Sequence, residues 1–201
     1  GIPGAGGGTG DVYLNPTGLL VLDNSVTPVD NRLSGRNINV SGADLTILGN
    51  SAAAVSETVG TFTLREGTSY FTLDADAAQQ LNFTTGAVTR TPQSTLIVRG
   101  DNLGDAAAAG VATIKGGAYV FIGQTGGTGS TNKSILPWAY GDTSPTGDGI
   151  FFLTADSAAE GANTGTNILR PLAVSEQTTD LATALANVNL TTNETLGSLT
   201  T

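Results

Sequence analysis

Short segments in which apolar and polar residues alternate before a glycine constrain this chain more than any other feature. Residues 38–42, 45–49 and 61–67 repeat one pattern, in which two alternating apolar residues lead into a glycine turn. A period of two is typical of strands that bury one face, and glycine, asparagine and aspartate close such strands with turns. The pattern therefore predicts an all-β fold built from many short strands.

The spacing of these segments narrows the architecture to two classes. In the first half of the chain they begin about every 8–12 residues, which suits either a β-solenoid or a β-sandwich. In a solenoid each coil buries its apolar face on the next coil. We predict a parallel β-solenoid with protruding loops, and a β-sandwich or jelly-roll subunit remains the alternative because periodicity does not separate them.

The chain divides into three parts by composition. We expect residues 1–10, which are rich in glycine, to be a connector or an intersubunit segment, and residues 11–187 to form the repeat domain. Loop insertions near 123–149, at 123–134 and 141–149, should protrude from it. Residues 188–201 should start the next repeat or pair with a neighbour, and residues 178–188 have the spacing of a short helix. We expect the chain to be one piece of a longer repetitive protein.

Charge excludes two classes of partner. Seventeen acidic and eight basic residues give a net charge of −9. Nucleic-acid binding requires clustered lysine and arginine, and so does docking on an anionic membrane surface. The sequence also has no run of 18 apolar residues, so we expect no membrane insertion.

The absence of histidine and cysteine removes most nucleophilic chemistry. Without them the Ser-His-Asp triad, the Cys-His dyad and ordinary zinc sites cannot form. A Ser–Lys pair would have to use Lys115 or Lys133, and the adjacent Lys133 and Ser134 lie in a glycine-rich stretch. We therefore predict a protein that is not an enzyme, with no catalytic or cofactor-binding residues.

Aspartates are the remaining candidates for chemistry. A polysaccharide-degrading β-helix enzyme would need paired carboxylates in a groove. The acids available for this are Asp74, Asp76, Asp101, Asp105, Asp142 and Asp148. All lie beside small residues or asparagine in apparent turns, where local hydrogen bonding accounts for them. Calcium is the second use of such acids, and its candidate ligands are Asp74, Asp76, Asp101 and Asp105.

From residue 31 onward the chain resembles a known family. The segments NRL at 31–33, INVSG at 38–42, LTILGN at 45–50 and ETVGTFTL at 57–64 resemble the autotransporter-associated β-strand repeat. The later pieces LIVRGDNLG at 96–104, ILPWA at 135–139, ILRPL at 168–172 and VNLTTNETLGSL at 188–199 are similar to segments that accompany that repeat. The resemblance implies a right-handed parallel solenoid in a secreted, large bacterial surface protein with a scaffold or adhesive role, and no catalytic residues.

These observations lead to one functional expectation. The chain should be a structural repeat of an extracellular bacterial fibre, filament or surface protein. Its partners should be copies of itself in a homo-oligomer, or adjoining repeats. Assembly would occur by strand pairing at unpaired terminal strands. The residues expected at this interface are Val12, Leu14, Leu19, Val21, Val188, Leu190, Leu196 and Leu199.

A carbohydrate-binding adhesin is the first alternative, with glycans as partners. Its groove would be lined by Trp138, Tyr119 or Tyr140. Trp138 and the Phe151–Phe152 pair are the bulkiest apolar groups late in the chain. They should fill the core or cap an open end, or else form a docking patch.

Overall fold

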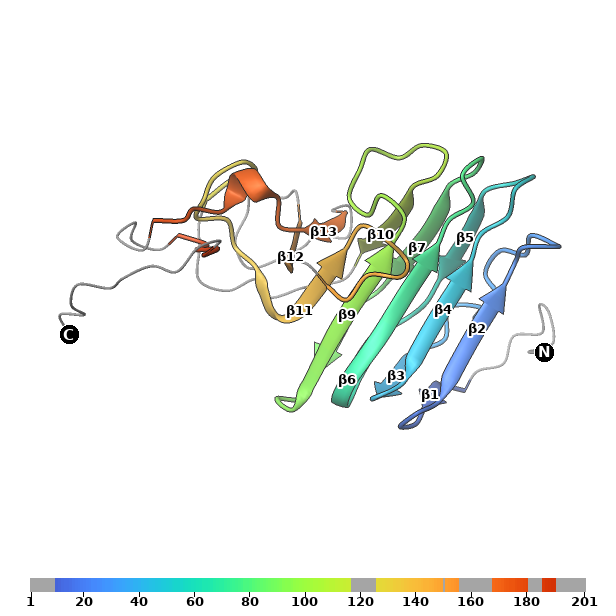
Figure 1. The fold of residues 1–201 in the computed structure, drawn as a ribbon. Coiled ribbons are helices and arrows are strands. Elements are labelled where there is room, and N and C mark those ends of the chain that lie inside the picture. The colour runs from blue at the N-terminus through green and yellow to red at the C-terminus, as the bar shows by residue number, and fades with distance from the viewer. Residues whose placement is uncertain (1–9, 117–125, 150, 156–167, 181–185, 191–201) are drawn as a thin grey trace.

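The chain forms a right-handed parallel β-solenoid (Figure 1). The computed structural model describes residues 10–116, 126–149, 151–155, 168–180 and 186–190. The fold prediction is confirmed and the sandwich alternative is wrong, because the long stacks pair in parallel from coil to coil. A sandwich would join neighbouring strands by antiparallel hairpins.

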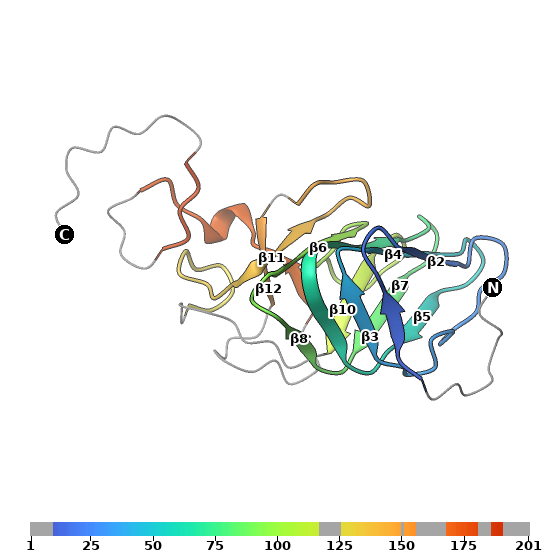
Figure 2. The same ribbon diagram turned by 90° about the horizontal axis from the view of Figure 1, so that it is seen from below.

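The strands form three stacks, which we call sheets 1, 2 and 3. Sheet 1 contains β1 (Val12–Leu14), β3 (Ile38–Ser41), the first part of β6 (Phe62–Asp74) and β8 (Val88–Arg90). Sheet 2 contains β2 (Leu19–Asp23), β4 (Asp44–Leu48), the second part of β6, β9 (Ser94–Gly100) and β11 (Leu136–Asp142). Sheet 3 contains β5 (Val55–Thr58), β7 (Leu81–Thr85) and β10 (Ala112–Gly116). Figure 2 shows sheet 1 from below, with β1 at the N-terminal end of the stack.

Register defines the length of one coil. In sheet 1, Val12 pairs with Ile38, Ile38 with Phe62, and Phe62 with Val88. The chain thus completes three turns between Val12 and Val88. Most side-chain hydrogen bonds between successive coils join residues 24 to 28 positions apart, so each coil is about that long.

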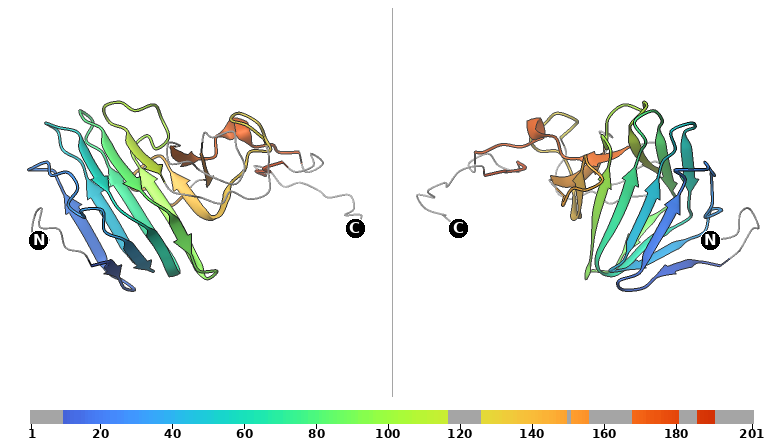
Figure 3. Two further views of the ribbon diagram at one scale, coloured as in Figure 1. Left: turned by 180° about the vertical axis from the view of Figure 1, so that it is seen from behind. Right: turned by 45° about the vertical axis from the view of Figure 1, so that its right-hand side comes forward.

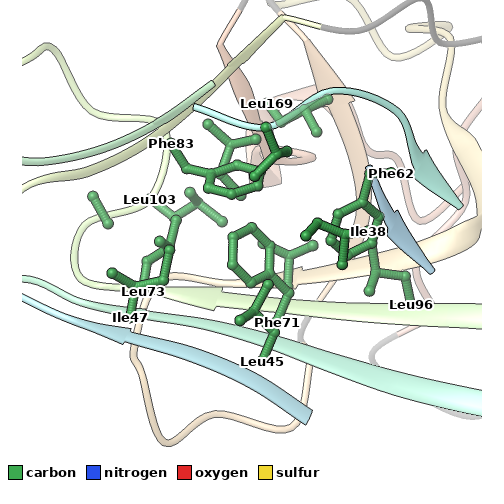
Figure 4. Close-up of a cluster of buried hydrophobic side chains, with 14 of the residues drawn as sticks. Ile38, Leu45, Ile47, Phe62, Phe71, Leu73, Phe83, Leu96, Leu103 and Leu169 are labelled. Atoms are coloured by element: carbon green, nitrogen blue, oxygen red, sulfur yellow. The ribbon is translucent and has the colours of Figure 1, made fainter. Parts of the chain in front are cut away.

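Ladders of inward-pointing apolar residues form the core. In sheet 2, Leu20, Leu45, Phe71 and Val98 are successive register partners. Phe71 meets Phe83 of sheet 3 edge-on, with ring centroids 4.6 Å apart. Figure 4 shows Leu45, Phe71 and Phe83 within the cluster of buried side chains between the sheets. Because most inward positions of the coils are apolar, the burial of each coil depends on its neighbours.

Two kinds of corner turn the chain between sheets. Thr17, Gly42 and Gly67 lie at the corner between sheets 1 and 2, and all have positive φ, at 65°, 54° and 70°. Glycine adopts this conformation without steric cost, which explains two of the three residues. At the corner after sheet 2, Asn50 Nδ2 donates to the carbonyl oxygen of Asn24 at 2.7 Å, so asparagines stack there from coil to coil.

The C-terminal end of the stack is closed by antiparallel strands. β12 (Phe151–Ala155) pairs antiparallel with β11 and with β13 (Leu169–Pro171). Ile168, just before β13, bridges to Lys115 of β10, so these strands reach from sheet 2 to sheet 3. Leu136, Leu153 and Leu169 are buried. Figure 3 shows this cap, β11 to β13, at one end of the molecule and β1 and β2 at the other.

The cap corrects the prediction of protruding insertions near 123–149. Lys133 and Ser134 are buried, and residues 136–142 form the fifth strand of sheet 2. Residues 143–149 do form a loop. The apolar residues of the last coil need a cover. The Gly- and Thr-rich composition of residues 123–149 does not show that some of these residues supply that cover.

The prediction of a helix over residues 178–188 is wrong for the two ends of this segment, which the structure describes. Thr178 and Val188 form a parallel bridge, and the Thr178 amide donates to the carbonyl oxygen of Asn187 at 2.8 Å. Residues 181–185 lie outside the described part. The one helical element described is the 3₁₀ turn η1 (Val174–Glu176). Pairing with a distant segment here overrides the local spacing of apolar residues.

Candidate functional site

The first coil has an edge with no partner strand among the described residues. β1 pairs only with β3, and β2 pairs only with β4, within residues 10–116 and the other described ranges. The opposite edge of each strand therefore carries backbone N–H and C=O groups available for pairing. Such an edge is a template for an added strand.

Two outward positions of the first coil, Tyr13 and Val21, are apolar where the next coils are polar. Tyr13 is followed in register by Asn39 and then Thr63, and Val21 is followed by Thr46 and then Thr72. Leu19 is 65% exposed and Val21 is 42% exposed. The guanidinium of Arg65 lies 5.5 Å from the centre of the Tyr13 ring. The first coil thus carries apolar surface that the middle of the stack avoids.

The predicted interface residues fall into three groups. Leu19 and Val21 point outward and are exposed, whereas Val12 and Leu14 are half-buried and pack against the core. Val188 and Leu190 are exposed at the other end of the chain, and Val188 bridges to Thr178. Leu196 and Leu199 lie outside the described residues. The structure therefore does not gather the predicted set at one place.

Sequence reasoning missed two exposed valines of the first coil. Val26 is 90% exposed and Val29 is 37% exposed, both in the turn after β2. Large exposed apolar residues of the described chain occur only on the first coil and around the C-terminal cap. They are Tyr13, Leu19, Val21, Val26, Val29, Tyr140, Val174, Val188 and Leu190. The sequence TPV at residues 27–29, within a run of turn residues, indicates a loop. Only the folded structure shows that the two valines of this loop are exposed.

Two carboxylates, one buried and one exposed, anchor the first coil to the second. Glu57 of β5 points inward and accepts hydrogen bonds from the backbone amides of Arg32 and Leu33, both at 2.8 Å. Burial raises the pKa of Glu57 above its ordinary value, although these two amides favour the charged form. Asp30 accepts a bond from the amide of Ser56 at 2.7 Å. The first coil lacks a regular strand in sheet 3, and these side chains hold it in place.

An ion pair fixes the C-terminal cap. Arg170 of β13 makes two hydrogen bonds of 2.7 Å to the carboxylate of Glu176, which also accepts from the amides of Gly129 and Ala173. Burial alone would raise the pKa of Glu176. The bonds from Arg170, Gly129 and Ala173 outweigh it and lower the pKa to about 2. The carboxylate joins three separate segments of the cap.

A groove of about 450 Å³ lies beside the cap. Tyr140, Phe151 and Phe152 line one part of it, and Gln177, Asn187 and Asn189 line another. Tyr140 stacks on Phe152 with ring centroids 4.8 Å apart and an interplanar angle of 27°.

Of the three aromatic residues predicted to line a glycan groove, Tyr140 lies in the groove beside the cap. Trp138 instead borders a small core cavity of about 20 Å³, and the Arg90 guanidinium lies 5.5 Å from the centre of its ring. Tyr119 lies outside the described residues. Trp138 thus has the predicted core-filling role, whereas Phe151 and Phe152 are half-buried at the groove.

The predicted calcium ligands bind backbone amides rather than gathering as a cluster. Asp101 Oδ2 accepts from the amide of Ala75 at 2.8 Å, and Asp76 Oδ1 accepts from the amide of Ala78 at 2.9 Å. Burial raises the pKa of Asp101, and the charge of the neighbouring Asp74 raises it further. Asp105 lies in the turn that follows β9. The described residues contain no group of three or more acidic side chains that could hold a metal ion.

The other predicted reactive residues are also dispersed. Asp142 accepts from the amides of Ser144 and Gly149, and Asp148 forms a 3.3 Å ion pair with Arg99 on the surface. Lys115 lies at the edge of sheet 3. Lys133 is buried in the cap, and its carbonyl oxygen accepts from Asn187 Nδ2. These contacts give each group a local structural role.

Comparison of the chain with protein-family models, with curated proteins and with solved structures gave no match. In the described part of the chain, no helix has the length and hydropathy needed to cross a membrane.

Proposed function

We propose that this chain is a non-catalytic structural unit of an extracellular bacterial fibre or surface protein, which assembles through the open edge of its first coil. Hydrogen-bonded coils make the unit stiff, and strand pairing at Val12–Leu14 and Leu19–Asp23 joins it to a second copy or an adjoining repeat. The extracellular location rests on the resemblance of residues 31–64 to autotransporter-associated repeats.

The distribution of exposed apolar residues carries this proposal. Leu19, Val21 and Val26 are exposed on the first coil, while no large exposed apolar residue occurs in the described coils between 30 and 116. A solenoid buries apolar surface by stacking, and apolar residues concentrated at its ends indicate contacts at its ends.

The closed cap supports the choice of edge. Strands β12 and β13 close sheet 2 with antiparallel pairs, and Ile168 bridges to Lys115 at the end of sheet 3, whereas β8, the last described strand of sheet 1, pairs only with β6 among the described strands. The edge of β1 and β2 remains available for strand addition. We therefore place the assembly contact at the first coil rather than at the C-terminal segment.

The contacts of the acidic residues support a non-catalytic role. Glu57, Asp101 and Asp142 each accept hydrogen bonds from backbone amides, which satisfies their charge within turns and between coils. A catalytic carboxylate pair would instead face a shared groove.

Sedimentation velocity over a wide concentration series tests the assembly contact. We expect the 201-residue chain to self-associate, and Val21→Lys to weaken association by about tenfold or more, because a charge at an added strand's edge opposes pairing. Thr46→Lys is the matched control, since Thr46 is the register partner of Val21 one coil further on.

Equal association of the wild-type and Val21→Lys chains would refute the proposed edge. A wild-type chain that stays monomeric at every concentration would refute self-assembly. Loss of association in Thr46→Lys as well would place the contact on the face of sheet 2 instead of at its edge.

A further inference from the structure

Aromatic and amide side chains both line the groove beside the cap. Among the aromatic residues, Tyr140 is 37% exposed although its ring stacks on Phe152. Phe151 extends this apolar surface, because it is half-buried and lines the same groove. A ring of this kind offers a flat apolar face to a ligand.

Two of the amide side chains that line the groove are held in place by hydrogen bonds to backbone carbonyl oxygens. Gln177 Nε2 donates to the carbonyl oxygens of Leu172 and Ala173, at 3.4 and 3.2 Å. Asn187 Nδ2 donates to the carbonyl oxygen of Lys133 at 2.9 Å. Their side-chain oxygens accept no hydrogen bond within the described part of the chain, so both groups retain acceptor capacity.

Charge defines the class of ligand. Among the described residues that line this groove, none is acidic or basic. The neighbouring Arg170 and Glu176 pair with each other, and Glu176 is 1% exposed in its side chain. A charged ligand would therefore find no opposite charge on the groove wall, and a ligand rich in hydroxyl donors would find acceptors.

We propose that this groove binds a neutral glycan, with a pyranose ring against Tyr140 and its hydroxyl groups donating to the side-chain oxygens of Gln177 and Asn187. The apolar face of a pyranose matches the aromatic surface, and its hydroxyls match the free acceptors. Ligand pockets commonly combine an apolar surface with a few placed polar groups in this way.

This binding site is independent of the assembly edge. Tyr140 belongs to β11, whereas Tyr13 belongs to β1, the first strand of the opposite end. A unit anchored at one end and binding sugar at the other would attach a fibre to a polysaccharide surface. Either property can fail without the other.

Isothermal titration calorimetry against neutral oligosaccharides tests the site. The probes are oligomers of glucose, galactose, mannose, xylose and N-acetylglucosamine in α and β linkages, with hexagalacturonate as a charged comparator and decaproline as a peptide comparator. We expect at least one neutral oligomer to bind with a Kd of about 1 mM or tighter, and hexagalacturonate and decaproline not to bind.

Variants connect that binding to the groove. Tyr140→Ala and Gln177→Ala should each weaken it by about tenfold or more, while Tyr13→Ala should leave it unchanged. Circular dichroism checks that each variant is folded. If Tyr140→Ala is unfolded, the affinity of Gln177→Ala alone tests the proposed site. Silence across the neutral panel, preference for hexagalacturonate or decaproline, or binding that survives Gln177→Ala would overturn the proposal.

Discussion

At the scale of single residues, the buried acids hold together segments that have no regular pairing. Glu176 joins β13, the turn at Gly129 and its own 3₁₀ turn, and Glu57 joins the first two coils. A buried carboxylate that accepts several hydrogen bonds costs much more to remove than a surface ion pair does. Among the described residues, the ion pair between Arg170 and Glu176 is buried and the ion pair between Arg99 and Asp148 lies on the surface.

We predict that Glu176→Gln lowers the free energy of unfolding by about 3–5 kcal/mol at pH 7, because the buried ion pair between Arg170 and Glu176 is lost. The folded pKa of Glu176 is about 2, below its ordinary value of 4.5, so its stabilising contribution is present above about pH 4.5 and is lost as the pH falls towards 2. Urea unfolding between pH 7 and pH 2.5 should show the difference between wild type and variant shrinking.

Asp148→Asn is the control for this prediction. Its side chain is 99% exposed, and its ion pair with Arg99 should contribute less than about 1 kcal/mol. Glu57 has a raised pKa, so its protonation favours the folded state as the pH falls. This effect is common to wild type and Glu176→Gln, so only the difference between their free energies of unfolding reports the contribution of Glu176. A difference that stays constant over the whole pH range would contradict the account.

At the scale of elements, each strand has an inward ladder and an outward ladder. In β6, Phe71 points into the core between Phe62 and Phe83, while Thr72 points outward beside its register partners Thr46 and Arg99. Adjacent residues of one strand therefore contribute differently to the free energy of unfolding.

We predict that Phe71→Ala lowers the free energy of unfolding by about 3–5 kcal/mol, because it leaves a cavity in the central aromatic cluster. Thr72→Ala should change it by about 0.5 kcal/mol or less, since the outward position buries little. Urea denaturation of both variants measures the two values. Equal losses would mean that the strand faces are not assigned as described.

Much of this element pattern could be predicted from sequence. Alternation in residues 61–64 and 70–73 identifies strands, and both segments fall in β6. The sequence did not show that one strand bends through Gly67 to serve two sheets, because a glycine there looks like an ordinary turn. The coil length escaped notice as well, although Gly42 and Gly67 share one corner and Asn24 and Asn50 share another.

The candidate sites were less predictable than the strands. Leu19 and Val21 could be named because they lie in a terminal strand that we expected to be unpaired, but Val26 lies in a turn-like sequence. Tyr140 and Gln177 lie 37 positions apart in sequence and meet only because the cap reverses direction twice. Contacts set by tertiary pairing leave no local signal.

At the scale of the whole molecule, the solenoid is asymmetric. One end exposes unpaired strands with apolar outward residues, and the other is closed by antiparallel strands and a buried ion pair. Sheet 2 is unpaired at the outer edge of β2 and closed beyond β11 by β12, so we place the added partner at the first coil. This asymmetry is the basis of the proposed assembly.

Hydrogen exchange measured by mass spectrometry at low and high protein concentration tests that claim most directly. The account predicts that the amides of Leu19–Asp23 in β2 exchange more slowly at high concentration, while those of Asp44–Leu48 in β4, already paired on both sides, do not change. Exchange in β2 that is the same at every concentration would contradict it.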